Sequence, residues 1–234
     1  MRLRALDARD RIAGRRGRLV PPRRLQVTAG DGDFVAVGDE FLSHLVALCG
    51  LRPDDRVLDV GCGVGRLARA LAGYLSIDGA YAGLDVQADA IAWCTRRYRG
   101  LPHFGFVHAD VRDARYNPGG AADAVAYRFP FEDGSFDVAV LMSVLTHLTA
   151  DPALHYLGQT RRVLARGGRV LATVLVLDPE APDRALPAEA VGCEEEWLLE
   201  ALRTAGLDFV ALHAGRWAGR SDGLGFEDLV VAHA

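Results

Sequence analysis

The chain has 234 residues, enough for one well-packed domain and short for two. Apolar residues make up 50% of it and charged residues 25%, as in ordinary globular proteins, and the net charge of −4 gives no general reason to expect nucleic acid or a membrane as partner. The four cysteines form no Cys-x-x-Cys pair, which argues against a zinc site or a disulfide scaffold. We therefore expect a cytoplasmic protein without a metal site.

A basic arm opens the chain. Its first 24 residues hold nine arginines and two aspartates, a balance that could attract an acidic substrate or RNA. We favour a solvated segment that is partly flexible or acts as a lid, and we divide the chain into this arm, residues 1–36, and one domain, residues 37–234. The arm lacks the apolar run of a signal peptide, and no stretch approaches the ~20 apolar residues of a membrane span.

Helical and extended patterns alternate along the rest of the chain. Helical spacing predicts helices over 37–49, 64–75, 88–98, 152–164 and 194–205. Short apolar runs predict strands over 56–60, 80–84, 104–108, 136–142, 169–177, 209–213 and 227–232. This order predicts a Rossmann-like, three-layer α/β sandwich with a mostly parallel seven-stranded sheet. The last two strands have no helix between them, so they should form an antiparallel hairpin at one edge.

A glycine-rich turn follows the first predicted strand. Gly61, Gly63 and Gly65 stand at alternate positions before a helix, where glycines let the backbone turn sharply and a ligand approach it closely. The dinucleotide fingerprint needs a glycine where this chain has Arg66, and the Lys-Ser or Lys-Thr end of a phosphate loop is missing. The turn alone therefore indicates a nearby ligand without identifying it.

Two acidic residues narrow the choice of ligand. Asp59 lies just before the turn, where a carboxylate would repel a pyrophosphate but suit an ammonium group. Asp85 ends the second strand, 20 residues after Gly65, where sheets of this class place a carboxylate on ribose hydroxyls. A nucleoside that carries an amino acid in place of phosphates fits both, and S-adenosylmethionine is such a molecule.

Residues 57–65, VLDVGCGVG, resemble the first motif of the class I S-adenosylmethionine-dependent methyltransferases. The likeness covers about residues 50–180 in the expected order, through Asp85, 108–111, 129–137 and 164–168. A narrower likeness is to a bacterial subgroup whose members mostly have no assigned substrate, and it rests on 32–34, 115–118, 143–147 and 217–230.

The resemblance implies how the cofactor S-adenosylmethionine would be held. The turn from Gly61 through Cys62 and Gly63 to Gly65 would lie under the methionine part and the ribose, with Cys62 a small packing residue rather than a nucleophile. Asp59 would face the ammonium group.

The ribose and the adenine have their own expected partners. Asp85 would chelate the ribose hydroxyls, and Val86 would lie against the adenine. Asp110 would accept from the adenine amino group, and the Val111 N–H would donate to a ring nitrogen. Met142, at the end of the fourth strand, completes the expected set. Asp85 and Asp110 also have an alternative interpretation as plain turn residues.

The chemistry should lie beyond the carboxyl ends of the fourth and fifth strands. Ser143, Thr146, His147 and Asp178 follow these strands and are expected to face the transferred methyl group. His147 is the first candidate base, with packing or capping of the next helix as its alternative role.

The acceptor side is expected to include the arm, the loop over 112–131, Tyr116, Thr146, His147 and Trp217. Trp217 has a structural role at the sheet edge as its alternative. Arginines and tyrosines in the arm and the loop favour an anionic or aromatic small molecule, while the net charge disfavours nucleic acid. A homodimer stays open.

The leading hypothesis is O-, N- or C-methylation of a small molecule by in-line displacement. The alternatives are methylation of RNA or protein, another alkyl transfer or an internal cyclisation with the same cofactor, and a non-catalytic cofactor-binding module. A nicotinamide-dependent oxidoreductase is disfavoured by the broken glycine spacing.

Overall fold

A computed structural model gives the fold of the chain. It describes residues 3–4, 6–7, 17–28, 30, 32–178, 186–187, 189–217 and 219–234. Five of the nine arginines of the basic arm, at positions 2, 9, 11, 15 and 16, lie outside the described residues. The division of the chain into an arm and one domain therefore stays a prediction.

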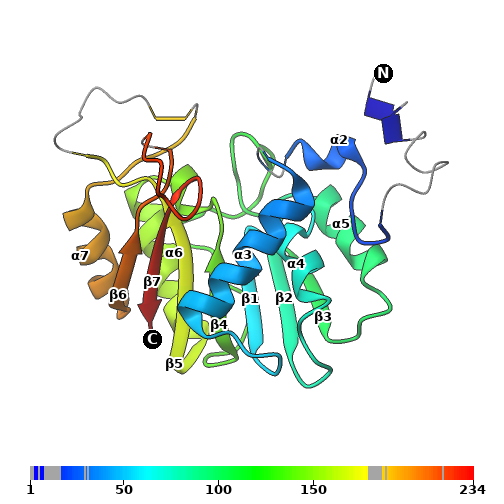
Figure 1. Ribbon diagram of the computed structural model, residues 1–234, viewed down its shortest axis with the longest axis horizontal. Coiled ribbons are helices and arrows are strands. Elements are labelled where there is room, and N and C mark those ends of the chain that lie inside the picture. Colours follow the sequence, from blue (N-terminus) through cyan, green and yellow to red (C-terminus); the bar gives the residue numbers. More distant parts are fainter. Residues whose placement is uncertain are drawn as a thin grey trace.

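The predicted seven-stranded sheet is confirmed, with the strand order β3-β2-β1-β4-β5-β7-β6 (Figure 1). Strands β1 to β5 pair in parallel, and β7 runs antiparallel to both β5 and β6. The bounds are β1 Arg56–Val60, β2 Ala80–Asp85, β3 Phe104–His108, β4 Phe136–Leu141, β5 Leu164–Val174, β6 Asp208–His213 and β7 Asp228–His233.

Helices cover both faces of this sheet, as the alternating pattern predicts (Figure 1). Helices α3, α4 and α5 pack on one face, where Val57 of β1 joins their apolar cluster, and α6 and α7 pack on the other face with Leu58. The bounds are α2 Arg23–Gln26, α3 Phe34–Cys49, α4 Arg66–Leu71, α5 Ala88–Arg97, the 3-10 helix η1 Leu145–His147, α6 Ala150–Val163 and α7 Glu195–Ala205.

Helix boundaries differ from the sequence prediction where capping decides them. Helix α3 begins three residues early because the Asp33 carboxylate accepts from the N–H groups of Val35 and Ala36. It ends at Gly50, whose φ of 59° gives the left-handed cap that glycine allows. Helix α4 is shorter than the predicted 64–75, because the chain leaves the helix in a turn after Leu71.

Strand β5 also departs from the predicted 169–177. It begins at Leu164, which pairs with Phe136, and the register then shifts before Arg169. It ends at Val174, and just beyond it the chain leaves the sheet and bridges from Val176 to Cys193. This early departure opens space between the end of β5 and the start of α7.

Parallel strands place their carboxyl ends at one edge of the sheet, the upper edge in Figure 1. Helix α2, the loop after β3 and the connection from β6 to β7 all lie at that edge (Figure 1). The described end of the basic arm is part of this layer, since Leu25 packs against the core and the Arg23 N–H donates to the Asp7 carboxylate at 2.6 Å.

Asp228 fixes the edge hairpin to the rest of the sheet. Its carboxylate is 1% exposed and accepts from the Val176 N–H at 2.9 Å, the Gly215 N–H at 2.6 Å and the Trp217 Nε1–H at 2.7 Å. Arg220 lies 3.4 Å from it. These hydrogen bonds satisfy the buried carboxylate and join three segments of chain.

Replacing Asp228 with Ala should lower the free energy of unfolding by about 3–5 kcal/mol, because two buried backbone donors and the half-buried Trp217 indole lose their acceptor together. Urea denaturation measures the loss. Asp208→Ala is the matched control, since Asp208 is exposed at the start of neighbouring β6, and it should change stability by no more than about 0.5 kcal/mol. Equal losses in the two variants would contradict this role of Asp228.

Candidate functional site

The turn after β1 is held in a left-handed conformation. Gly61, Gly63 and Gly65 have φ angles of 74°, 51° and 78°, which residues with a side chain rarely adopt. The N–H groups of Gly61 and Cys62 both donate to the Leu84 carbonyl, at 2.7 and 3.1 Å, so the turn is tied to the end of β2. The glycines therefore serve the backbone path that the sequence predicts.

The three glycines differ in what surrounds them. A Cβ at Gly61 would lie 2.4 Å from Cγ2 of Val144, and one at Gly65 would lie 3.2 Å from the Cys94 sulfur. A Cβ at Gly63 would meet nothing within 4 Å. Gly61 and Gly65 are thus close to the protein's own side chains, whereas Gly63 borders open space that a ligand can enter.

Asp59 is fully buried beneath this turn. Tyr81 donates to its Oδ2 at 2.6 Å, while its Oδ1 is buried without a hydrogen-bond partner in the described residues. Burial raises the pKa of Asp59 to about 7, the Asp85 charge adds to the rise, and the Tyr81 hydrogen bond opposes it. A buried carboxylate oxygen without a donor is ready to accept one from a cationic ligand.

Asp85 shapes the turn directly. One carboxylate oxygen accepts from the Gly63 N–H at 2.7 Å and the other from the Gln87 N–H at 2.7 Å. Burial raises the pKa of Asp85, and these two backbone N–H groups work against that rise. The carboxylate is 7% exposed. It orders the glycine turn besides standing where ribose hydroxyls are expected.

The segment after β3 forms a compact turn next to Asp85. The Ala109 N–H donates to the Asp85 carbonyl at 2.9 Å, and the Val111 N–H, predicted to serve adenine, donates to the Ala109 carbonyl at 2.7 Å. The exposed Asp110 carboxylate accepts from the Asn117 side chain at 3.1 Å. Val86 lies alongside, with its carbonyl 3.0 Å from the His108 ring. The adenine roles of Asp110 and Val111 stay predictions.

The end of β4 places polar groups beside the glycine turn. Ser143 has a φ of 53°, a conformation that costs energy for a residue other than glycine. Its N–H donates to Thr173 Oγ1 at 2.7 Å, and its hydroxyl donates to Glu227 at 2.9 Å. The Thr146 hydroxyl also donates to Glu227, at 3.3 Å. Glu227 is a residue that the sequence pattern did not single out, because it lies 84 positions from Ser143.

His147 is exposed at the end of η1, and its ring lies 6.5 Å from that of Tyr116, edge to face. Two predicted residues from distant segments thus meet. Arg115 stacks on Tyr116 at 5.1 Å and pairs with Glu189 at 2.5 Å, which joins the loop after β3 to the segment after β5.

The remaining predicted residues have less direct places. Trp217 donates to Asp228, so the structure shows its structural contact at the sheet edge. Met142 is half-buried and packs against the apolar cluster under α3 to α5. Asp178 lies four residues past the end of β5 and is half-buried.

The Cys62 thiol is buried in the turn. Burial raises its pKa well above its usual range, which disfavours the thiolate that a nucleophile needs. The packing role of Cys62 stays a prediction. Within the part of the chain that the structure describes, no group of three metal-ligating side chains comes together. None of the helices described there is long and apolar enough to cross a membrane.

Comparison with known proteins identifies the class. Residues 57–168 match the family model described as a methyltransferase domain. A 2-phytyl-1,4-naphtoquinone methyltransferase of Trichormus variabilis is 27% identical over 175 residues, covering 73% of this chain and 66% of that protein. An uncharacterised 37.1 kDa protein in a transposon of Streptomyces fradiae is 34% identical over 120 residues, covering 51% of this chain and 30% of that protein. This chain therefore spans between about a third and two thirds of these relatives.

Solved structures share the whole fold. The [4+2]-cyclase SpnF superposes with a TM-score of 0.63 at 21% identity, covering 92% of both chains. An S-adenosylmethionine-dependent methyltransferase from Aquifex aeolicus gives 0.58 at 18% identity, covering 84% of this chain and 88% of that one. Residues 57–168 therefore match a methyltransferase domain, and the chain shares its fold with proteins described as S-adenosylmethionine-dependent methyltransferases. S-adenosylmethionine is the cofactor that these descriptions name.

The residues present fit that cofactor. The buried Oδ1 of Asp59 lacks a donor, which an ammonium group supplies, and the open space at Gly63 lets a ligand reach the backbone. Asp85 offers carboxylate oxygens at the end of β2, where a ribose is expected.

Separate substitutions of Gly61 and Gly63 should distinguish an effect on stability from an effect on cofactor affinity. Gly63→Ala puts a methyl group into open space, so stability should fall by only about 1–2 kcal/mol, from the left-handed φ, while S-adenosylmethionine affinity should fall at least about tenfold. Gly61→Ala collides with Val144, so it should cost about 3 kcal/mol or more, part of which Val144→Ala restores. Calorimetry and urea denaturation give the two quantities. Unchanged cofactor affinity in Gly63→Ala would show that the ligand does not approach this glycine.

Cofactor affinity should depend on pH through Asp59. With its pKa at about 7 in the free protein, Asp59 is mostly protonated below pH 7 and must lose that proton to meet an ammonium group. The dissociation constant should therefore rise up to about tenfold for each pH unit below 7 and level off above it. Asp59→Asn should bind more weakly and lose this dependence. Calorimetric titrations between pH 5.5 and 7.5 measure it, and a parallel slope in wild type and variant would exclude Asp59 as the source.

Proposed function

We propose that this protein transfers the methyl group of S-adenosylmethionine to a small-molecule acceptor. The observation that carries the proposal is the pairing of a buried, unsatisfied Asp59 oxygen with the open face of the glycine turn at Gly63. The glycine turn lies next to the polar groups at the end of β4. A cofactor bound in the turn would present its methyl group to these polar groups.

The residues at the end of β4 suit the acceptor's side of an in-line displacement. The cofactor supplies a methyl group on a positively charged sulfur, and that charge is lost as the bond to the acceptor forms. Much of the rate then comes from holding the acceptor close and aligned. Ser143, which is exposed and fixed by Thr173 and Glu227, is the group proposed to orient it. Thr146 is buried, so we propose that it holds Glu227 rather than touching the acceptor.

A protonated acceptor also needs a base. His147 is the proposed base because it is exposed beside the Tyr116 ring, and its imidazole accepts or donates no hydrogen bond among the described residues. Glu227 is the second candidate, since its carboxylate already accepts from two hydroxyls at this end of the sheet.

We propose an aromatic acceptor rather than an anionic one. Two arginines of the loop over 112–131, which favour an anion in the sequence, each pair with a carboxylate: Arg115 with Glu189 and Arg128 with Asp133. The half-buried Tyr116 ring and the exposed His147 ring offer aromatic contacts instead. The 2-phytyl-1,4-naphtoquinone methyltransferase and a demethylmenaquinone methyltransferase of Symbiobacterium thermophilum, 29% identical over 133 residues, are named for ring compounds, which agrees with this proposal.

Another reaction with the same cofactor site remains the second candidate. The superposition on a protein titled as a [4+2]-cyclase means that the fold alone does not fix the reaction. Product mass separates the two: methyl transfer adds one methyl group to the acceptor, whereas a cyclisation leaves the substrate's mass unchanged.

The decisive experiment incubates the protein with S-adenosylmethionine and a set of phenols, quinols and heteroaromatic amines, and searches for methylated products by mass spectrometry. Asp85→Ala should abolish both cofactor binding and turnover. His147→Gln should retain cofactor affinity while kcat falls about 100-fold or more. Tight binding of NAD with no binding of S-adenosylmethionine would overturn the proposed function.

A further inference from the structure

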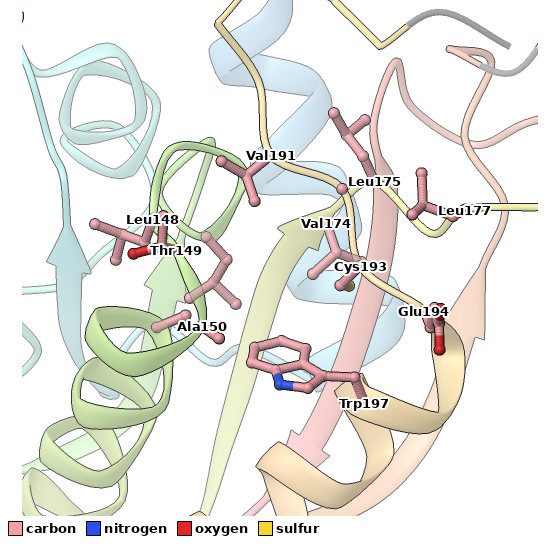
Figure 2. Close-up of a pocket in the computed structure, with 13 residues that line it drawn as sticks. Leu148, Thr149, Ala150, Val174, Leu175, Leu177, Val191, Cys193, Glu194 and Trp197 are labelled. Atoms are coloured by element: carbon pink, nitrogen blue, oxygen red, sulfur yellow. The ribbon is translucent and has the colours of Figure 1, made fainter. Parts of the chain in front are cut away.

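A cavity of about 460 Å³ lies between the end of β5 and the first turns of α6 and α7, and its lining includes no residue of the glycine turn (Figure 2). Its lining comes from η1, α6, β5, the segment before α7, and α7 itself. In Figure 2 the Trp197 indole reaches from α7 into this space toward Ala150 on α6. The volume falls in the range that holds a drug-sized ligand.

The cavity has a buried floor and an open mouth. Leu145, Val174 and Leu175 form part of the floor and are 7%, 3% and 1% exposed. Thr149 and Ala150 are exposed on the rim. An apolar ligand can therefore enter from solvent and bury its surface against the floor, which is where the hydrophobic effect stabilises binding.

The walls offer few polar groups to a ligand. The Cys193 N–H donates to the Leu175 carbonyl at 2.9 Å, the Leu177 N–H to the Cys193 carbonyl at 2.9 Å, and the Val191 N–H to the Thr146 carbonyl at 2.8 Å. Burial raises the pKa of the Cys193 thiol to about 11, so this side chain is neutral. A group bound on this floor finds apolar contacts and no free backbone donor among these residues.

The mouth carries negative charge. Glu194 lines the cavity, and Glu195 and Glu196 follow it in the first turn of α7, where they line an adjoining hollow; all three are exposed. These carboxylates repel an anion that approaches the opening. A hydrocarbon that ends in a phosphate, sulfonate or carboxylate is therefore disfavoured against the same hydrocarbon without a charge.

We propose that this cavity binds an uncharged aromatic ring system, which packs beside the Trp197 indole, on a molecule that presents no anion at the mouth. The site is separate from the glycine turn and does not depend on the proposed methyl transfer. It shares η1 with the acceptor side, because Leu145 faces the cavity while Thr146 and His147 belong to the set beside the glycine turn.

Calorimetric titration with two matched probes tests the proposal. 2-Naphthol should bind, and 2-naphthalenesulfonate, the same rings with an anion, should bind at least about tenfold more weakly. Ala150→Leu places a larger side chain at the rim and should weaken 2-naphthol binding at least about tenfold. Ala92→Leu, the same change at an exposed position on α5 across the sheet, should leave it within about twofold.

Two further measurements complete the test. Combining Glu194→Gln, Glu195→Gln and Glu196→Gln should bring the sulfonate to within about threefold of 2-naphthol. S-adenosylmethionine affinity should be equal in wild type, Ala150→Leu and Ala92→Leu, which shows that the variants are folded. If S-adenosylmethionine binds to none of these proteins while 2-naphthol still binds, the result counts against the proposed function and not against the cavity proposal. Absence of 2-naphthol binding at about 1 mM, or equal binding by the two leucine variants, would overturn the cavity proposal.

Discussion

Burial of a carboxylate at the end of β1 is the constraint on which the arrangement of the site depends. Asp59 lies in the middle of the sheet, where an unpaired charge is costly, and its one side-chain donor among the described residues is Tyr81. Tyr81 is itself fixed by stacking on Phe104 of β3 at 5.0 Å, and Tyr98 stacks on the same ring from the end of α5. The apolar core under α5 thus fixes the Tyr81 hydroxyl, whose hydrogen bond lowers the cost of burying Asp59.

The cofactor-binding half of the site could be predicted from the sequence because its residues lie close together along the chain. The turn from Gly61 to Gly65 lies between β1 and α4, and Asp85 reaches Gly63 across only 22 positions. Parallel pairing of β1 with β2 in register brings the ends of both strands to one level. Strand order and strand ends are therefore sufficient to place Asp59, Gly63 and Asp85 together.

The half of the site that faces the methyl acceptor could not be predicted in this way. Ser143 contacts Glu227 across 84 positions, and Arg115 contacts Glu189 across 74. Both contacts join irregular segments, which have no hydrophobic periodicity from which their relative positions could be predicted. A pattern of residue types indicated Ser143, Thr146 and His147 but had no means to find Glu227. The same limit applies to the boundaries of β5, where a register shift after Phe136 moves the start of the strand to Leu164. The start of α3, in contrast, depends on a local signal, because an aspartate at position 33 is a typical N-cap that could have been recognised in the sequence.

The conformation of Ser143 links the two halves. Its φ of 53° would be relaxed in glycine, yet a hydroxyl is kept there, held by Thr173 on β5 and by Glu227 from the edge hairpin. Val144, the next residue, is the side chain that closes over Gly61. A shift of this segment to fit a different acceptor would therefore press on the glycine turn unless Val144 stayed in place. The contacts to Thr173 and Glu227 keep the strained residue fixed, and with it the distance between the donor turn and the groups that face the acceptor.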